Sequence, residues 1–593
     1  MTKLGGLFIA LAAATHAAAQ ETASIQIPPG DAVKTRPLVR DVFGYSIEPI
    51  WVNAYTDTPL AAKLLSAIGA VTGKPPPIRV GGNTADQTYQ HDTLPNGRDW
   101  DAIRGELSTV QQFNVTPAWY GAWADYFPRG TDLIYSLNFR ANESGWANAV
   151  AQAEAVHAAL GSGRLRMFEL GNEIDHFINK HWRAADWGVD MYIDQFRNLT
   201  GQIVAADWYQ KLPEDQRPKF QAGVFADPPW VPDQHDEIDD FSIENLTTLA
   251  TDRSKAGGIV EREQDKAIIG SYAMHLYPQS TCDTARWHRM RLDLLSDHLV
   301  LWQNVSQYAP QVAAADRAGA PLIMGETNSV SCSGKSGISD TFGAALWTVD
   351  YVLLGASVGL EKTYFHLGAQ SEYSAFTPQG YTLKNETLDS GIRPNWYSHY
   401  FVAKVVRPLG SAGNRNRGNA SLPDGYALYD GGERKDKPRR LDKLVFLDMG
   451  VWNGTEGLSN PSTLSATDGT MFSEGARPNR TLHLATSWCA GRNATVTRLL
   501  GPGTNAKSNV TVSGATFDPE SGDLKKNGVT GETAKVGEDG AVTITMRRAE
   551  AVLLEMEDTR PCGKAASAAA GTALRVDGIL VSVISVAGLL ISL

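Results

Sequence analysis

Two glutamates carry the clearest chemical signal in this chain. Glu173 lies in FELGNEIDHF and Glu326 in PLIMGETNSV, and each follows a run of mostly apolar residues typical of a buried strand. A glutamate is usually a solvated surface charge, which the end of an apolar strand does not favour. The pair therefore predicts a protein that cleaves glycosidic bonds with one carboxylic acid and one carboxylate.

The elements that would position this pair are strands and helices that alternate along the chain. Strand-like runs are VFGYSIEP, PIRVGGN, LIYSLNF or TPAWYG, LRMFELGNE, KFQAGVF, AIIGSYAMHLYP, PLIMGE and KTYFHLG. Helical patterns cover residues 145–160, 191–206, 288–318 and 339–360. This alternation predicts an α/β fold, a (β/α)8 TIM barrel, whose active site lies at the carboxyl ends of the strands. With LIYSLNF as the third strand, Glu173 follows strand four and Glu326 ends strand seven.

After residue 410 the sequence pattern changes to short strands of alternating polarity, such as RTLHLATSW and AVTITM, separated by Gly, Asn, Asp and Pro. This pattern predicts a C-terminal β-sandwich. The expected organisation is a signal peptide (1–19), a strand that crosses over to the β-domain (20–36), the catalytic barrel (37–410), the sandwich (411–560) and a removable tail (561–593).

The two ends of the chain predict where the protein acts. Lys3, a short apolar stretch and Ala17–Ala19 form the pattern of a cleaved signal peptide. Small residues in Ala565–Gly571, a polar spacer and a terminal apolar tail resemble an attachment signal for a glycosylphosphatidylinositol (GPI) anchor. A C-terminal membrane helix is the alternative, but the tail is short and no basic residues follow it. We expect a secreted protein attached to the outer cell surface or wall by a lipid anchor.

Composition agrees with secretion. Asn-x-Ser/Thr sequons, each a candidate for N-glycosylation, begin at Asn114, Asn142, Asn198, Asn245, Asn304, Asn385, Asn419, Asn453, Asn479, Asn493 and Asn509. The net charge is −11 without a long basic run, so nucleic acid is not an expected partner. No CxxC or HxxxH spacing indicates a metal site, and we expect neither a metal nor an organic cofactor.

Several motifs together resemble glycoside hydrolase family 79, the family of heparanase and microbial β-glucuronidases. They are RVGGNTAD, FELGNEID, AMHLYP, MGETNS and NWYSHYFVAKVVRPLG. The resemblance implies a retaining hydrolase that releases β-linked glucuronic acid, with or without a 4-O-methyl group, from extracellular oligo- or polysaccharides.

The resemblance also implies roles for the central residues. Glu173 would be the acid/base, with a pKa raised by burial and by the neighbouring carboxylate. Glu326 would be the ionised nucleophile. Asn172 would contact the sugar 2-OH, although Asn also suits a turn at this position.

Further contacts follow from the same motifs. Tyr277 would donate a hydrogen bond to the nucleophile, and His275 lies two residues earlier on the same strand face, either near the ligand or as an ordinary core histidine. Glu48 and Asn83 match positions that contact sugar hydroxyls. A buried ion pair with Arg79 is the alternative for Glu48.

The substrate carboxylate is expected to bind the loop after the second glutamate. In heparanase this loop is glycine-rich and its backbone amides hold the glucuronate; here it reads SVSCSGKSG and places Cys332 and Ser333 there. In the family a tyrosine hydroxyl of the eighth strand assists; the chain has Phe365 at that position, and Tyr364 beside it is the expected substitute for this contact. Lys335 offers a compensating charge, or is a solvated loop residue.

The cysteines allow three disulfide connectivities in an oxidising compartment. Because Cys282 follows strand six and Cys332 strand seven, whose loops are neighbours, we predict a Cys282–Cys332 bond. Cys489 would then pair with Cys562.

Two other functions fit the same sequence. One is an endo-acting, heparanase-like hydrolase or a wall-remodelling transglycosylase. The other is an inactive, wall-anchored glycoprotein that binds sugar, which the presence of both glutamates disfavours.

Overall fold

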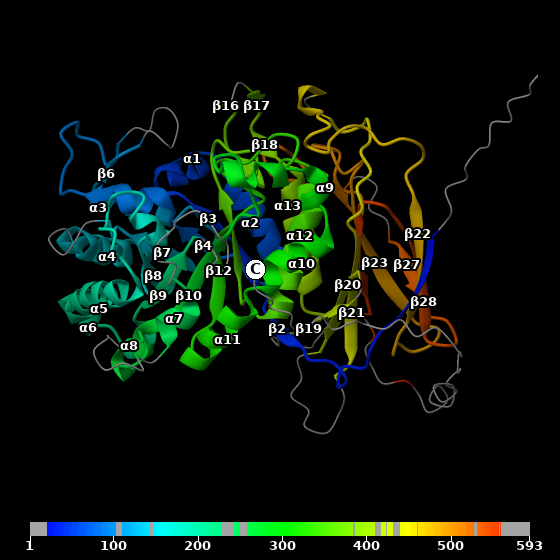
Figure 1. Ribbon diagram of the computed structural model, residues 1–593, viewed down its shortest axis with the longest axis horizontal. Coiled ribbons are helices and arrows are strands. Elements are labelled where there is room, and N and C mark those ends of the chain that lie inside the picture. The colour runs from blue at the N-terminus through cyan, green and yellow to red at the C-terminus, as the bar shows by residue number, and fades with distance from the viewer. Residues whose placement is uncertain are drawn as a thin grey trace, which may run out of the picture.

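The computed structural model describes residues 21–101, 110–140, 146–226, 241–248, 258–383, 386–409, 417–422, 424–430, 439–458, 461–526, 531–556, 558 and 562. Within these residues, eight parallel strands close into a barrel (Figure 1). In chain order they are β3 (Phe43–Ile47), β4 (Ile78–Val80), β7 (Leu133–Leu137), β8 (Leu165–Leu170), β9 (Lys219–Phe225), β10 (Ile269–Leu276), β12 (Leu322–Thr327) and β14 (Thr363–Leu367). The predicted (β/α)8 barrel is confirmed, and LIYSLNF is its third strand.

Helices surround the barrel, among them α2 (Pro59–Thr72), α3 (Pro117–Ala124), α4 (Trp146–Leu160), α5 (Val189–Ala205), α12 (Phe342–Val358) and α13 (Pro394–Val406). The long helix expected over residues 288–318 is wrong. It is divided into α9 (Leu292–Leu295), α10 (His298–Ser306) and α11 (Ala309–Ala318). Asp297 starts α10 by accepting from the amides of Leu299 and Val300, and Pro310 lies in the first turn of α11.

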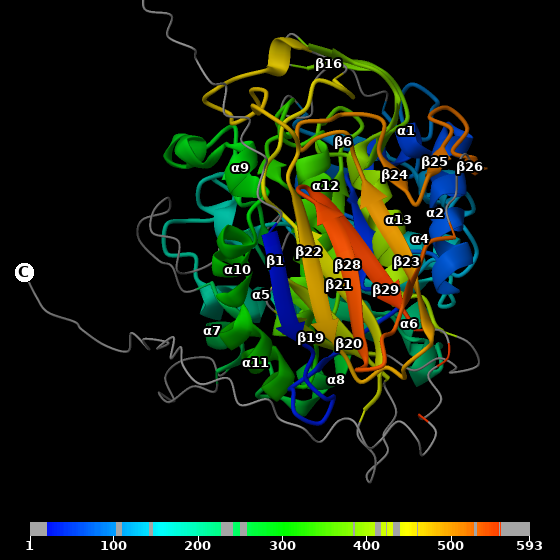
Figure 2. The ribbon, with the colours of Figure 1, turned by 90° about the vertical axis from the view of Figure 1, so that its right-hand side faces the viewer.

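The C-terminal region forms two packed sheets, as the sequence predicts. The large sheet contains β2 (Arg36–Leu38), β19 (Arg417–Leu422), β20 (Gly425–Tyr429), β21 (Leu441–Asp448), β29 (Glu550–Glu555), β23 (Asn493–Leu500), β24 (Thr511–Val512), β25 (Ala515–Phe517) and β26 (Leu524–Lys526). The small sheet contains β1 (Glu21–Gln26), β22 (Asn479–Ala485) and β28 (Ala541–Arg547), with β1 parallel to β22 (Figure 2). Side chains such as Phe446, Leu484 and Ile544 fill the space between the sheets.

Helices α12 and α13 lie between the barrel and the large sheet (Figure 1). Nearly every residue of α12 is buried, which matches a helix that is apolar on all sides. Asn419 of the β-domain donates to the Leu353 carbonyl of this helix, and the Tyr426 hydroxyl reaches Asp350. No helix in the described part of the chain is long and apolar enough to cross a membrane.

The expected signal peptide lies outside the described residues, as does the C-terminal tail except for Cys562. The sequons at Asn142 and Asn385 are also outside them. Asn419 and Asn453 are buried, and each uses its side-chain amide to bond backbone carbonyls. A glycan needs that same nitrogen at the surface, so the folded structure contradicts glycosylation at these two positions.

A buried ion cluster joins the barrel to the β-domain. Lys443 and Glu555 are opposite each other on neighbouring strands, 2.8 Å apart and fully buried, and Arg407 at the end of α13 donates to Glu555 at 2.9 Å. Removing one member of a buried pair leaves an uncompensated charge, which costs roughly 3–5 kcal/mol.

We therefore predict that Glu555→Ala lowers the free energy of unfolding by about 3–5 kcal/mol, measured as a shift of the urea midpoint. Glu21→Ala is the matched control, because the Glu21 side chain pairs with Arg480 at 3.5 Å but is itself 64% exposed. An equal midpoint for both variants would contradict a stabilising role for the cluster.

Candidate active site

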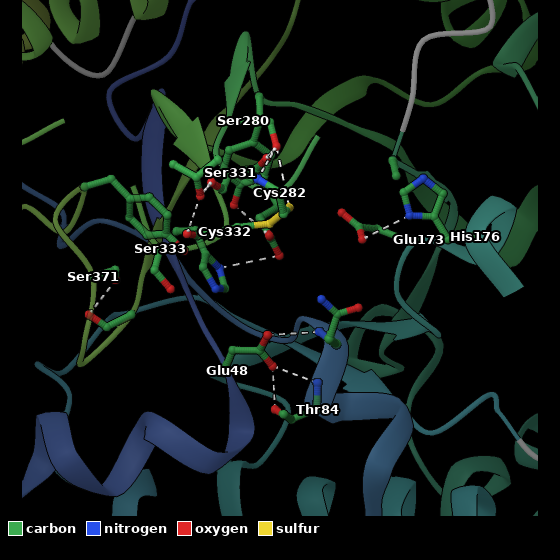
Figure 3. Close-up of a pocket in the computed structure, with 18 of the residues that line it drawn as sticks. Glu48, Thr84, Glu173, His176, Ser280, Cys282, Ser331, Cys332, Ser333 and Ser371 are labelled. Atoms are coloured by element: carbon green, nitrogen blue, oxygen red, sulfur yellow. Dashed lines mark hydrogen bonds and ion pairs between the residues drawn. A yellow bond between two sulfur atoms is a disulfide. The ribbon is translucent and has the colours of Figure 1, made fainter. Parts of the chain in front are cut away.

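A cavity of about 910 Å³ opens at the carboxyl ends of the barrel strands. Glu173 and His176 form one wall, facing the Cys282–Cys332 bond and Ser333 across the cavity (Figure 3). Glu48 forms a third wall, together with Thr84. Both predicted disulfides, Cys282–Cys332 and Cys489–Cys562, are present.

The two glutamates meet in this cavity. One carboxylate oxygen of Glu173 lies within 4.8 Å of one of Glu326. Glu173 adopts a left-handed backbone, with φ of 52°, after Gly171 at 73°. A side chain at Gly171 would meet Phe139 at 2.9 Å. Such backbone strain is common at functional sites, and here it turns Glu173 away from its strand and into the cavity.

Arg79 supports the floor of the site from below. Its guanidinium is fully buried and donates to Glu326 at 2.8 Å, to Glu169 at 3.0 Å and to the Ser46 hydroxyl at 2.8 Å. The alternative of a Glu48–Arg79 ion pair is wrong, because Arg79 bonds Glu169 and Glu326 instead.

Glu326 is held in its ionised form. Burial alone would raise its pKa, but His366, His275 and the Arg79 guanidinium together lower it. The Tyr277 hydroxyl donates to the second carboxylate oxygen at 2.8 Å, as the sequence predicted. Both oxygens of Glu326 thus accept hydrogen bonds.

Glu173 differs from the expectation. Burial favours a raised pKa, but a hydrogen bond from His275, at 3.2 Å, and the charges of His176 and Lys180 lower the pKa of Glu173 to about 2. The predicted raised pKa is therefore wrong for the ligand-free site. The reason is a neighbour that sequence spacing did not place in contact: the His275 ring reaches Glu173 from a different strand.

Glu48 is the third acid of the cavity. Burial, and then the negative charge of Glu326, raise the pKa of Glu48 to about 7. Its carboxyl accepts from the amides of Asn83 at 3.0 Å and Thr84 at 2.8 Å. Gly82, with φ of 124°, permits this approach, since a Cβ there would lie 2.5 Å from the Glu48 carboxyl carbon. Below about pH 7 Glu48 is neutral and is able to donate a hydrogen bond.

Glu173, His275 and Glu326 also offer three atoms of the kind that bind metals, all within 4.8 Å. The Arg79 guanidinium occupies one Glu326 oxygen, and Tyr277 the other. A cation bound there would compete with an existing buried positive charge. The donor set therefore suits proton transfer better than metal binding.

The remaining predicted residues fall into two groups. Asn83, Cys332 and Ser333 line the cavity. Asn172 lies beneath it: its side-chain oxygen accepts from Arg79 at 2.8 Å and its amide nitrogen is 3.5 Å from the Asn83 oxygen. Cys332 and Ser333 have left-handed backbones, with φ of 60° and 71°.

Tyr364 does not reach the cavity, so its predicted contact with substrate is wrong. It packs in the barrel interior against Ile134 and Ile323, near the amino ends of the strands. Side chains alternate along a strand, so the next inward residue of β14 is His366, which lines the cavity 3.4 Å from Glu326. Lys335 also lies elsewhere, in an ion pair with Asp468 of the β-domain.

Sequence reasoning missed much of the lining. The other residues that form the cavity wall include Trp51, Thr84, His176, Lys180, Trp182, Arg286, His366 and Tyr373. Of these, only His366 was predictable from the sequence, because it lies two residues after Tyr364 and therefore on the same face of the strand. The others lie on loops, whose positions no periodicity indicates.

Comparison with known proteins agrees with this arrangement. Residues 425–553 match the family model described as the glycosyl hydrolase family 79 C-terminal beta domain. The chain is 26% identical over 538 residues to a β-glucuronidase of Neurospora crassa, covering 84% of this chain and 88% of that protein. It is 26% identical over 513 residues to a β-glucuronidase of Aspergillus niger, covering 83% and 86%.

Solved structures share the fold. A 4-O-α-L-rhamnosyl-β-D-glucuronidase from Fusarium oxysporum 12S superposes with a TM-score of 0.66 at 22% identity, over 90% of this chain and all of that one. An arabinofuranosidase superposes with a TM-score of 0.54 at 14% identity.

A barrel that holds two close glutamates at its carboxyl end, followed by this β-domain, defines a glycoside hydrolase. Its β-domain matches that of glycoside hydrolase family 79, and the chain as a whole is similar to two fungal β-glucuronidases.

We predict that Tyr277→Phe raises the pKa of Glu326, because it removes a donor from the ionised form. Activity on an aryl glycoside should fall about 10- to 100-fold, and the acid limb of its pH profile should move to higher pH. Tyr272→Phe is the matched control, since this hydroxyl on β10, the strand that Tyr277 follows, has no partner among the described residues. An unshifted acid limb in Tyr277→Phe would contradict the assignment.

Proposed function

We propose that the chain is a retaining β-glucuronidase that acts by double displacement. The observation that carries the proposal is the approach of Glu173 and Glu326 to within 4.8 Å between their nearest oxygens. Retaining glycosidases separate the two carboxyl groups by about 5–5.5 Å, whereas inverting enzymes leave about 6.5–9.5 Å for a water molecule.

The electrostatics support a division of roles. Glu326, kept ionised, attacks the anomeric carbon and forms the glycosyl–enzyme bond while the bond to the leaving oxygen breaks. Glu173 gives its proton to that oxygen, then takes one from the water that hydrolyses the intermediate. Since Glu173 and His275 are hydrogen-bonded at 3.2 Å, the pair is able to share one proton, which moves to Glu173 when the leaving oxygen arrives.

The β12–α12 loop is the proposed site of the substrate carboxylate. The Ser333 amide has no acceptor among the described residues, and Ser333 lines the cavity. Successive amides in turn conformations form concave sites for anions. Asn83 and the neutral form of Glu48 line the cavity, where they would contact sugar hydroxyls. The named activities of the N. crassa, A. niger and F. oxysporum proteins support the same substrate class.

We also propose that the protein acts outside the cell on glycans that carry β-linked glucuronic acid, with or without 4-O-methylation. The signal-peptide pattern, the GPI-type tail and the exposed sequons at Asn198, Asn245 and Asn493 support this location.

The catalytic pair is tested by substitution. Glu326→Gln should abolish turnover of all aryl glycosides. Glu173→Ala should spare substrates with good leaving groups, because a phenolate needs little protonation, and azide should rescue it with a β-configured product. Glu361→Gln, at the other end of the barrel, is the matched control. Near-normal activity in Glu326→Gln would refute the mechanism, and an α-configured azide product would refute retention.

Substrate charge is tested by comparing p-nitrophenyl β-D-glucuronide with the glucoside, galactoside and xyloside. Two charge-assisted hydrogen bonds, each worth roughly 1.5–3 kcal/mol, predict a preference of about 10²- to 10⁴-fold in kcat/KM for the glucuronide. The optimum should be mildly acidic, where protons are available to Glu173 and the substrate carboxylate is still ionised. Equal rates on glucoside and glucuronide would reject the glucuronidase assignment but leave the glycosidase assignment intact.

A further inference from the structure

The loop between β12 and α12 (residues 328–341) adopts a backbone conformation that is unfavourable for two of its residues. Cys332 and Ser333, neither of them glycine, have φ of 60° and 71°, and Gly334 follows at 83°. Left-handed non-glycine residues cost of order 1–3 kcal/mol each and persist only where the surroundings hold them.

Contacts within the barrel hold its first half. The Cys282–Cys332 bond ties it to the loop after β10, and the Glu372 amide donates to the Ser333 carbonyl at 2.9 Å. The second half, residues 335–340, is a compact turn in which the Ser339 hydroxyl accepts from the Lys335 amide at 3.0 Å.

The β-domain holds this second half through Lys507. The ammonium group of Lys507 donates to the Ser336 hydroxyl at 2.7 Å and lies 2.9 Å from the Asp340 carboxylate. The two charged side chains are only 4% and 3% exposed. Because both charges are shielded from water, each depends on the other for stabilisation. Loss of one partner leaves the other charge buried without compensation.

The same segment of the β-domain also fixes the start of α12. The Thr504 and Ala506 carbonyls accept from the amides of Gly343 and Phe342 at 2.8 Å. These amides belong to the first turn of the helix, where no carbonyl within the helix is available to them. The loop is therefore tied to residues 504–507 at its turn and at its exit into α12.

We propose that Lys507 is a specificity-determining positioning residue, which acts through the 335–340 turn to hold the Ser333 amide toward the carboxylate of the substrate. This inference rests on the proposed glucuronidase function. Lys507 is not among the residues that line the cavity, so its effect on substrate is indirect. Without it, the left-handed residues relax and the amide no longer points at the carboxylate, whereas Glu173 and Glu326 keep their places on other supports.

The test is Lys507→Met, which keeps the length of the side chain and removes its charge. The ratio of kcat/KM for p-nitrophenyl β-D-glucuronide to that for the glucoside should fall about 10- to 100-fold, mainly through KM for the glucuronide. The glucoside rate should change less than about threefold. Lys63→Met is the matched control: Lys63 forms another ion pair between barrel and β-domain, with Asp523, but on the exposed surface. It should leave the ratio unchanged.

Hydrogen exchange of peptides spanning residues 328–341 gives a readout that needs no substrate. Exchange should accelerate about tenfold or more in Lys507→Met and not in Lys63→Met. If Lys507→Met does not fold, Asp340→Asn tests the same pair with little change of shape. Unchanged exchange, or equal losses on both substrates with an unchanged ratio, would overturn the inference. A wild-type enzyme without preference for the glucuronide would refute the proposed function instead, and exchange would still decide whether Lys507 holds the loop.

Discussion

One buried guanidinium holds the floor of this active site together. Arg79 lies on β4 and contacts side chains from three other barrel strands: Ser46 on β3, Glu169 on β8 and Glu326 on β12. Two buried carboxylates without a cation would be costly, and a buried arginine without carboxylates equally so. The charges therefore stabilise one another only in the assembled barrel, which couples the fold to the ionised state of Glu326.

The same charge balance separates the acids of the cavity. Arg79, together with His275 and His366, keeps Glu326 ionised, and that negative charge in turn contributes to the raised pKa of Glu48. Glu173 does not contact Arg79, and its pKa is lowered by the hydrogen bond from His275 and by the charges of His176 and Lys180. The three glutamates of one cavity thus have pKa values that are shifted differently, because each has different neighbours.

The β-domain is part of the catalytic unit in physical terms. Its large sheet covers α12 and α13, its carbonyls complete the first turn of α12, and Lys507 neutralises Asp340 in the loop between β12 and α12. A barrel without this cover would expose an apolar helix and leave these polar groups unpaired.

The sequence alone determined the barrel, the β-domain, both disulfides and the places of Glu173 and Glu326, because these depend on alternation along the chain and on the order of strands. It failed where side chains from distant segments meet. Arg79 forms ion pairs with Glu169 and Glu326 and not with Glu48. The hydrogen bond from His275 helps to lower the pKa of Glu173, which was expected to be raised. Tyr364 packs inside the barrel, one layer of side chains below the cavity. Such contacts arise only when strands close around a common centre, so the tertiary structure decided them: the distances that set electrostatics are fixed by packing, not by spacing in the sequence.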